Sequence, residues 1–426
     1  MSHSLCLLLL LASSAFAAQH AVLVAGSQGF SNYRHQADVC HAYQTLVSSG
    51  MDAANIIVMM MDDIANNSQN PFPGQLFNKP DGQDVYAGVQ IDYRGHDVTP
   101  KNFLAVLTGD SQTTGGKRVL ETTADDEVFI FFSDHGAPGL IAFPSEYLYA
   151  KDLNNAINTM HSKKMFKNLL FYLEACESGS MFDQILQSDI GVYAVTAANP
   201  HQSSWATYCY PHDTVNGMHI NSCLGDEFSV NWMEDSDKHI QSLSQDTYQV
   251  GQQYDTVKGE TTESQVMEYG EQDLKTLPVG EFQGEKQASF VEKFLLRAAP
   301  QKQYGMNSAE SARVSSRDAH LHHLYSKYQQ TGYHSHALEL QKELSHRMTM
   351  DLVFDHFNSK LGLTEEDDGS SVHEIHDCLE ASINNFEHRC GKLSDYSLKH
   401  VRQFVKACNK GIPYDFIFHT IQALNC

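Results

Sequence analysis

The nine residues 128–136, VFIFFSDHG, join a strongly apolar run to a reactive end. A short, unbroken apolar run of this kind predicts a strand that is buried on both faces, as in a parallel sheet. A second such run, LLFYL at residues 169–173, leads into residues 174–176, EAC. Open α/β sheets carry their chemistry just beyond the carboxyl ends of such strands. His135 and Cys176 are therefore candidates for an acid/base group and its nucleophile.

Outward from these two runs, strand and helix signals alternate along the N-terminal part of the chain. Further strands are predicted at 21–25, 56–61 and 192–196, and helices at 36–48, 100–107, 150–160 and 180–186. This alternation predicts an α/β fold class with a mostly parallel sheet flanked by helices. Residues 66–100 are rich in Asn, Pro, Gly and Asp and are predicted to form a loop. The sequon at 66–68 makes Asn66 a candidate glycosylation site in that loop.

The composition changes towards the C-terminus. Residues 283–316 are polar and charged and give no strand signal, which predicts a linker or domain boundary. Beyond it, apolar residues recur at spacings that place them on helix faces. These residues are Leu321, Leu324, Tyr325, Tyr328, Leu338, Leu340, Met348, Leu352 and Phe357. We therefore expect a small all-α C-terminal domain.

The N-terminus and the charge bear on where the protein works. Residues 1–17 hold an apolar run and end in an A-x-A pattern, and no later apolar segment reaches about 18 residues. We expect a cleaved signal peptide, the secretory pathway and no membrane span. The net charge of −23 at pH 7 argues against nucleic acid or an anionic membrane as a partner. Protonation at low pH would relieve this charge, so we expect a lysosome, an acidic vacuole or secretion. A soluble protein that is simply acidic is the alternative explanation.

The nine cysteines fall into groups by position. Cys209 and Cys223 flank a polar loop. Four more lie in the last fifty residues, at Cys378, Cys390, Cys408 and Cys426. In a secreted chain these four are expected to form two disulfides, for which three pairings exist. Zinc is the alternative, but no C-x-x-C spacing supports it, and the sequence predicts no metal and no cofactor.

A thiol attacks as the thiolate, and a nearby imidazole can assist its ionisation and then protonate a leaving amine. Cys176 and His135 fit these two roles. Gly136 has no side chain, so its N–H could approach an oxyanion closely, with the N–H of Cys176 as a second donor. The alternative is a buried free cysteine and an unrelated histidine.

Eight segments together carry a resemblance to a known family. They are residues 24–27, 32–38, 59–64, 97–107, 133–136, 174–181, 197–200 and 229–237. The chain resembles the legumain family of asparaginyl endopeptidases, which are cysteine peptidases with a caspase-like fold. The resemblance is specific from about residue 20 to residue 284. It continues more weakly to the C-terminus, where the helices and the four cysteines resemble the prodomain of the family.

The resemblance implies a role for each matching residue. Cys176 would be the nucleophile, His135 the general acid/base, Asn32 the residue that orients the imidazole, and Gly136 part of the oxyanion hole. The reaction would pass through a thioester. The residues that would line the pocket before the scissile bond are Arg34, His35, Glu174, Ser203, Ser204 and Asp226.

Such a pocket suits asparagine, because a cation can donate to the amide oxygen while carboxylates accept from the amide nitrogen. Aspartate would face the carboxylates of Glu174 and Asp226. We therefore expect cleavage after Asp only at low pH, where a carboxyl group can take a proton. Without the family resemblance, a structural ion pair and a simple turn would explain these residues.

The resemblance also implies a domain order and a mode of control. The implied order is a signal peptide at 1–17, a peptidase domain at 18–288, an activation linker at 289–307 and a helical prodomain at 308–426. The prodomain would cover the active site until acid releases it. Asn307 is the candidate processing site. The implied disulfides are Cys209–Cys223, Cys378–Cys408 and Cys390–Cys426. Twelve of the 23 histidines lie between His320 and His419, so they are either an acid switch or simply solvated helix residues.

The expected partners are protein and peptide substrates and cystatin-type inhibitors. Three other activities compete with an acid-activated protease. A peptide ligase or transpeptidase would use the same site, with an amine in place of water. A transamidase that attaches lipid anchors shares the His and Cys motifs but is membrane-associated. An inactive binding protein is disfavoured because His135 and Cys176 are both present.

Overall fold

The computed structural model describes residues 17–285, 312–366 and 372–426. Residues 1–16 of the predicted signal peptide, the predicted linker 289–307 and the candidate processing site Asn307 lie outside these residues. In the described part of the chain, the main sheet has six strands in the order β13-β8-β7-β3-β1-β2. Their bounds are β1 Gln19–Ala25, β2 Ile56–Met59, β3 Glu127–Ser133, β7 Asn168–Glu174, β8 Val192–Thr196 and β13 Met267–Gly270. All neighbours run parallel except β13, which is antiparallel to β8.

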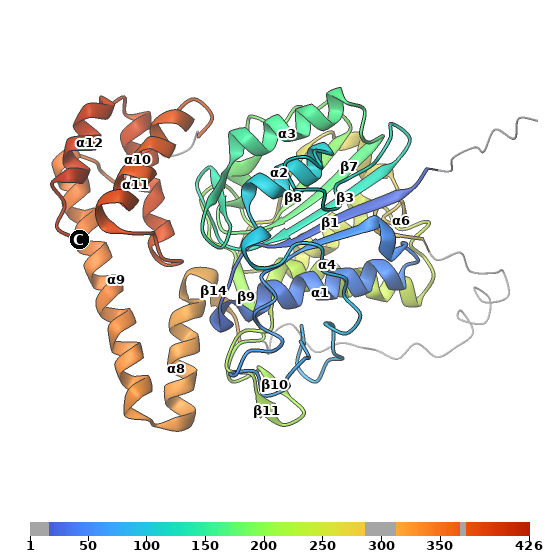
Figure 1. Ribbon diagram of the computed structural model, residues 1–426, viewed down its shortest axis with the longest axis horizontal. Coiled ribbons are helices and arrows are strands. Elements are labelled where there is room, and N and C mark those ends of the chain that lie inside the picture. The colour runs from blue at the N-terminus through green and yellow to red at the C-terminus, as the bar shows by residue number, and fades with distance from the viewer. Residues whose placement is uncertain (1–16, 286–311, 367–371) are drawn as a thin grey trace, which may run out of the picture.

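Helices cover both faces of this sheet (Figure 1). Helices α1 (Tyr33–Ser48) and α4 (Glu227–Gln241) lie on one face, and α2 (Pro100–Thr108) and α3 (Ala150–Ser162) lie on the other. The side chains of each strand alternate between the two faces. In β1, Leu23 therefore packs in one core and Val22 in the other. The predicted mostly parallel sheet flanked by helices is confirmed.

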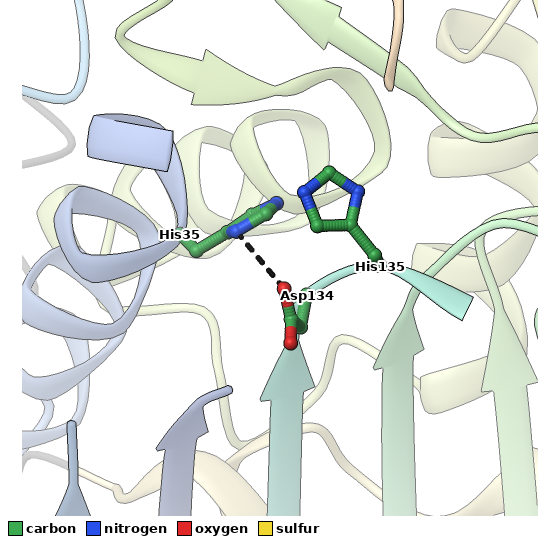
Figure 2. A group of neighbouring side chains, drawn as sticks. All are labelled: His35, Asp134 and His135. Atoms are coloured by element: carbon green, nitrogen blue, oxygen red, sulfur yellow. Dashed lines mark ion pairs between the residues drawn. The ribbon is translucent and has the colours of Figure 1, made fainter. Parts of the chain in front are cut away.

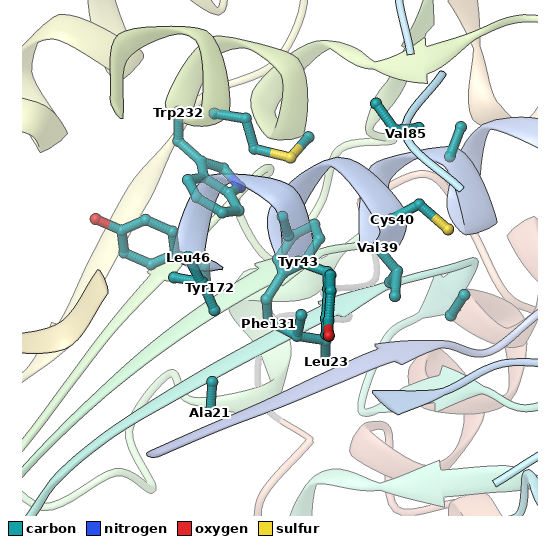
Figure 3. Packing of buried hydrophobic residues seen from close by; sticks show 14 of the residues in the cluster. Ala21, Leu23, Val39, Cys40, Tyr43, Leu46, Val85, Phe131, Tyr172 and Trp232 are labelled. Atoms are coloured by element: carbon teal, nitrogen blue, oxygen red, sulfur yellow. The ribbon is translucent and has the colours of Figure 1, made fainter. Parts of the chain in front are cut away.

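The core on the α1 and α4 side is built around aromatic residues. Trp232 of α4 is fully buried, and its ring lies 5.1 Å from Phe131 of β3 and 5.6 Å from Tyr172 of β7, each centroid to centroid. Figure 3 shows Trp232, Tyr172 and Phe131 gathered around Leu46 and Tyr43 of α1. Edge-to-face packing of this kind holds α1 and α4 against the strands that carry the candidate site.

The strand register decides which side chains meet at the sheet edge. Ala25 of β1 pairs with Ser133 of β3, and Ser133 pairs with Glu174 of β7. The three strands therefore end at the same level. Residues 134–136 and 175–177 leave the sheet side by side, as expected for parallel strands.

Short elements surround this edge. Small strands are β4 Gly136–Ala137, β5 Leu140–Ala142, β6 Tyr147–Tyr149, β9 Trp205–Thr207, β10 Thr214–Val215, β11 Met218–His219, β12 Gly225–Asp226 and β14 Val314–Ser315. Two further helices of the first part are α5 Val250–Glu260 and α6 Gly280–Gln283. Disulfide Cys209–Cys223 closes the loop between β9 and β12.

The C-terminal part is helical and packs beside the edge of the sheet (Figure 1). Its helices are α8 Ala319–Thr331, α9 His334–Leu361, α10 His376–Cys390, α11 Val401–Asn409 and α12 Tyr414–Gln422. Its core includes Phe354, Phe386 and Phe404 and extends to Ala137 and Leu140 of the first part. Disulfides join Cys378 to Cys408 and Cys390 to Cys426. Within the described ranges, no helix is long and apolar enough to cross a membrane.

Three expectations from the sequence are wrong in detail. No α-helix forms at 180–186, where a 3₁₀ turn spans Ser178–Met181. The Ser180 hydroxyl there donates to the Glu177 carbonyl and accepts from the N–H of Gly139, and such side-chain bonds compete with a helix. The supposedly strandless segment before residue 316 contains β14, because β9 provides a partner.

The third wrong expectation concerns helix α9, whose apolar residues do not all lie on a buried face. Its inward side buries Val353, Phe354 and Phe357, whereas Met348 and Leu352 are each 67% exposed. Leu338 is exposed as well. The apolar spacing therefore correctly predicted a helix but overestimated how much of it is covered.

Candidate active site

His135 and Asn32 form a direct hydrogen bond. Asn32 lies at the start of α1, and its Oδ1 is 2.9 Å from Nε2 of His135. The Asp395 carboxylate lies 3.2 Å from the same nitrogen. Because both partners are acceptors, Nε2 must carry the proton. The other ring nitrogen, Nδ1, is buried and has no hydrogen-bond partner within the described residues. It is therefore the nitrogen that can take a proton from a reactant.

Gly136 lies where the two reactive strand ends approach most closely. A Cβ atom at this position would overlap the carbonyl oxygen of Cys176 and would lie 3.0 Å from the Cβ of Ala175. A larger residue would force the two chain segments apart. Glycine is therefore required here by proximity of the backbones rather than by an unusual φ angle.

A buried charged cluster lies next to His135, whose ring centroid is 5.0 Å from that of His35. The Nε of Arg34 donates to Oδ1 of Asp226 at 2.8 Å, and Nε2 of His35 lies 3.5 Å from the other Asp226 oxygen. Glu174 accepts from the backbone N–H and the hydroxyl of Ser229 through one oxygen. Burial and the nearby Asp226 carboxylate raise the pKa of Glu174 well above its usual range. Glu174 therefore takes up a proton more readily than an ordinary glutamate.

This cluster has unused polar atoms. Nη2 of Arg34, Oε1 of Glu174 and Oδ2 of Asp226 are all buried, and each lacks a hydrogen-bond partner within the described residues. Buried polar atoms in folded proteins are nearly always paired. One donor nitrogen and two acceptor oxygens together complement a side-chain amide.

Asp134 and His35 complete the surroundings of His135. Figure 2 shows the His35 ring beside that of His135, with Asp134 below them. Nδ1 of His35 lies 3.4 Å from Oδ1 of Asp134 and 2.7 Å from the Ser27 hydroxyl. The three side chains have potential ligand atoms within 4.8 Å of one another.

A segment of the C-terminal part occupies the site. Strand β14 pairs antiparallel with β9, and the N–H of Ser316 donates to the Ser204 carbonyl at 3.0 Å. The Ser316 hydroxyl lies 3.1 Å from that of Ser204, which is itself 3.6 Å from Sγ of Cys176. Cys176 is 0% exposed as a result. Burial raises the pKa of its thiol, and the Arg317 guanidinium opposes part of that rise.

Charged residues fix this segment and the helices behind it. Arg317 contacts Oε2 of Glu177 at 2.7 Å, and Arg402 lies 3.4 Å from the other oxygen of Glu177. Desolvation raises the pKa of Asp395, but His135 and Asn32 more than offset this and hold it below its usual range. The Asp395 carboxylate therefore stays ionised at acid pH.

The remaining predicted residues are spread around the site. Ser204 lies inside it, whereas Ser203 is only partly buried. Asn66 is exposed on its loop. Asn307 lies outside the described residues.

Sequence reasoning missed Ser316, Arg317 and Asp395, which carry no motif and reach the site only through tertiary packing. Asp38 was within a quoted motif but received no role. It is fully buried, accepts from Asn78 and Ser133, and has a pKa that burial and the nearby Asp226 raise well above its usual range.

Comparisons with known proteins cover both parts of the chain. The peptidase C13 family matches residues 19–285, and the family described as legumain, prodomain matches residues 335–425. A vacuolar-processing enzyme from Vicia sativa is 41% identical over 414 residues, which cover 92% of this chain and 83% of that protein. One from Citrus sinensis is 40% identical over 418 residues, covering 92% of this chain and 82% of that protein.

A legumain from Canavalia ensiformis is 38% identical over 420 residues, which cover 92% of this chain and 85% of that protein. Among solved structures, caspase-1 from Spodoptera frugiperda matches 64% of this chain and 92% of that chain. The TM-score is 0.37 and the sequence identity 10%, and no argument rests on this similarity.

Proposed function

The chain belongs to the peptidase C13 family and is a cysteine endopeptidase, and we propose that it cleaves peptide bonds after asparagine and is made as an acid-activated zymogen. The observation that carries the specificity is the set of unpaired buried atoms on Arg34, Glu174 and Asp226. The observation that supports the zymogen is the β14 segment across Cys176.

The proposed reaction follows from the positions of Cys176 and His135. Nδ1 of His135 takes the thiol proton, and the Sγ thiolate attacks the carbonyl carbon before the scissile bond. Backbone N–H groups of Gly136 and Cys176 stabilise the oxyanion. The intermediate collapses to a thioester, and the departing amine takes the proton from the imidazolium. His135 then deprotonates a water molecule, which attacks the thioester, releases the carboxylic acid and restores the thiol.

Asparagine specificity follows from the unpaired atoms of the charged cluster. The amide oxygen of a substrate asparagine would accept from Nη2 of Arg34, and its NH₂ group would donate to Glu174 and Asp226. A substrate without the amide would leave these buried atoms unpaired. Pockets built in this way discriminate strongly against such substrates.

Acid activation has a candidate in His323 of α8. This side chain is buried against the first part of the chain, and its Nδ1–H donates to the carbonyl of Asn221 at 2.5 Å. Burial lowers the pKa of His323 to about 4, with a further lowering by Lys327 and His320 that Glu339 opposes. A released His323 would return to its ordinary pKa near 6.5.

The lowered pKa of His323 in the docked state favours release at low pH. Because the pKa is lower in the docked state, that state binds fewer protons between about pH 6.5 and pH 4. Docking is therefore weakened as the pH falls through this range, by up to about 3 kcal/mol. His400 has a pKa lowered to about 4 by burial and by Lys399, and its partners Asp351 and Phe354 belong to the C-terminal core, so its protonation would weaken that core.

The proposed location is the secretory pathway, leading to an acidic compartment. Two of the relatives above are named vacuolar-processing enzymes. An acidic vacuole or lysosome would supply the protons that His323 requires for release. Binding of cystatin-type inhibitors to this protein stays a prediction.

The test compares wild-type full-length protein with Cys176→Ser after acid incubation. Matched peptides carry Asn, Asp, Gln or Lys before the scissile bond, and mass spectrometry identifies the products. We expect cleavage after Asn that is absent from Cys176→Ser. Cleavage after Lys or Gln at a comparable rate would contradict the pocket. Joined peptides would show that an amine competes with water for the thioester.

A further inference from the structure

The β14 segment occupies the site with the register of a substrate. Val314 pairs with Ala206 of β9, Ser315 pairs with Trp205, and the N–H of Ser316 donates to the Ser204 carbonyl. The Ser316 hydroxyl lies 3.5 Å from Oδ1 of Asp226 in the charged cluster. Ser316 therefore takes the place of the residue before a scissile bond, and Arg317 takes the place of the residue after it.

Arg317 occupies a defined position beside the nucleophile. Its Nη2 donates to the Gly136 carbonyl at 2.5 Å and to Oε2 of Glu177 at 2.7 Å. The side chain is 5% exposed. Two acceptors that converge on one guanidinium form a charge-assisted contact, which is stronger than a neutral hydrogen bond.

Both acceptors belong to the peptidase part of the chain, which also holds the backbone of each residue in place. Glu177 follows Cys176 directly, its N–H donates to the Gln202 carbonyl at 2.7 Å, and its carbonyl accepts from Ser180. Gly136 is held against Cys176 by contact of the two backbones. Both cations on Glu177, Arg317 and Arg402, come from the C-terminal part. When that part leaves, the carboxylate and the carbonyl are left for a substrate.

We propose that Glu177 and the Gly136 carbonyl form a subsite for a cationic side chain directly after the scissile bond. This inference rests on the proposed function and adds the class of substrate: bonds between Asn and Arg, and to a lesser degree between Asn and Lys. Arginine is favoured because a guanidinium is more weakly hydrated than an ammonium and therefore costs less to bury, and the Arg317 side chain is only 5% exposed here.

The test uses full-length protein incubated at acid pH until it cleaves a reference peptide with an Asn–Ala bond. The series then places Arg, citrulline, Lys or Glu after Asn. Citrulline has the shape of arginine without its charge. We expect kcat/KM for Arg to exceed that for citrulline by about three- to tenfold, with Glu the poorest substrate. High salt should reduce the Arg to citrulline ratio.

Two variants assign the effect to Glu177. In Glu177→Gln the Arg to citrulline ratio should fall to near one. The ratio is taken within each variant, so a change in overall activity does not affect it. Glu121→Gln is the matched control, because Glu121 is exposed in the loop that leads into β3 at the opposite edge of the sheet. Its ratio should equal that of the wild type.

The outcomes separate this inference from the function on which it rests. Equal rates for Arg and citrulline in the wild type, with normal cleavage of Asn–Ala, would overturn the subsite alone. No cleavage of any Asn peptide would contradict the proposed function. If Glu177→Gln does not fold, the wild-type peptide series and its salt dependence still test whether the subsite prefers a cation. An unchanged ratio in a folded Glu177→Gln protein would remove Glu177 from the subsite.

Discussion

Three carboxyl groups, on Asp38, Glu174 and Asp226, lie close to the guanidinium of Arg34. Burial and the nearby Asp226 carboxylate disfavour the charged forms of Asp38 and Glu174. The pKa values of these two groups are therefore raised well above their usual range. Asp38 and Glu174 hold their protons to higher pH than ordinary carboxyl groups and lose them as the pH rises further.

This protonation predicts how cleavage after aspartate depends on pH. A neutral Glu174 can donate to a substrate carboxylate, whereas an ionised Glu174 repels it. We expect wild-type kcat/KM for Asp peptides to fall as the pH rises through the raised pKa of Glu174, while Asn peptides are affected less. Equal cleavage after Asn and Asp at pH 7 would contradict this pocket.

The substitution Glu174→Gln tests the residue directly. The glutamine oxygen can still accept from Ser229, which leaves its NH₂ group as a permanent donor towards the pocket. We expect the ratio of Asp to Asn cleavage at pH 6.5 to rise by about tenfold or more, and its pH dependence to flatten. Kinetics at pH 4.5 and 6.5 on the acid-incubated full chain measure this, with Glu121→Gln as the control.

At the scale of elements, β14 is a strand of two residues that exists because β9 accepts it. So short a strand has no stability of its own, and its pairing is reinforced by Arg317 and by the N–H of Ser316. In the proposed zymogen the segment would inhibit without being cut, because the Ser316 side chain is too short to bond with Arg34 and Glu174 as an asparagine would.

This interpretation predicts that Ser316→Asn converts the inhibitory segment into a substrate. The longer side chain would place its amide among the unpaired atoms of the charged cluster. We expect a new cleavage after residue 316 at acid pH, detected by the mass of the fragments. Ser316→Gln should not be cut there, and Cys176→Ser combined with Ser316→Asn should stay intact. Absence of the new fragment from an active Ser316→Asn protein would show that the segment lies out of register.

At the scale of the whole molecule, the two parts are held together by contacts that differ in their response to acid. Asp395 stays ionised because its pKa is lowered, so its bond to His135 does not fail on acidification. His323 is the opposite case, since it is buried in the neutral form and must take up a proton when the pH falls. Adding positive charge does not by itself strengthen docking when the histidine is desolvated.

The substitution His323→Gln should therefore shift activation to lower pH. Glutamine can still donate to the Asn221 carbonyl but does not titrate. We expect the midpoint of activation to fall by roughly half to one pH unit, because release is then accompanied by the uptake of one proton fewer. The rate of appearance of Asn cleavage, followed from pH 7 to pH 4, measures this shift. His388→Gln, at an exposed position of α10, should leave the midpoint unchanged.

Much of the fold could be read from local patterns. The runs at 128–132 and 169–173 are apolar on both faces, and both became central strands. The segment at 180–186 was predicted as a helix and is not one, because Ser180 bonds to nearby backbone groups. Exposure along α9 could not be predicted, since spacing reveals a face but not the partner that covers it.

The sequence by itself determined the sheet, the reactive strand ends and the family, because these depend on neighbouring residues and on short motifs. The tertiary structure alone decided what lies against Cys176 and His135. Ser316, Arg317 and Asp395 follow Cys176 in sequence by 140 residues or more in each case, and local chemistry contains no signal for such contacts. Their pairing depends on how the whole chain closes, which also sets the burial of Cys176 and His323 and hence their pKa values.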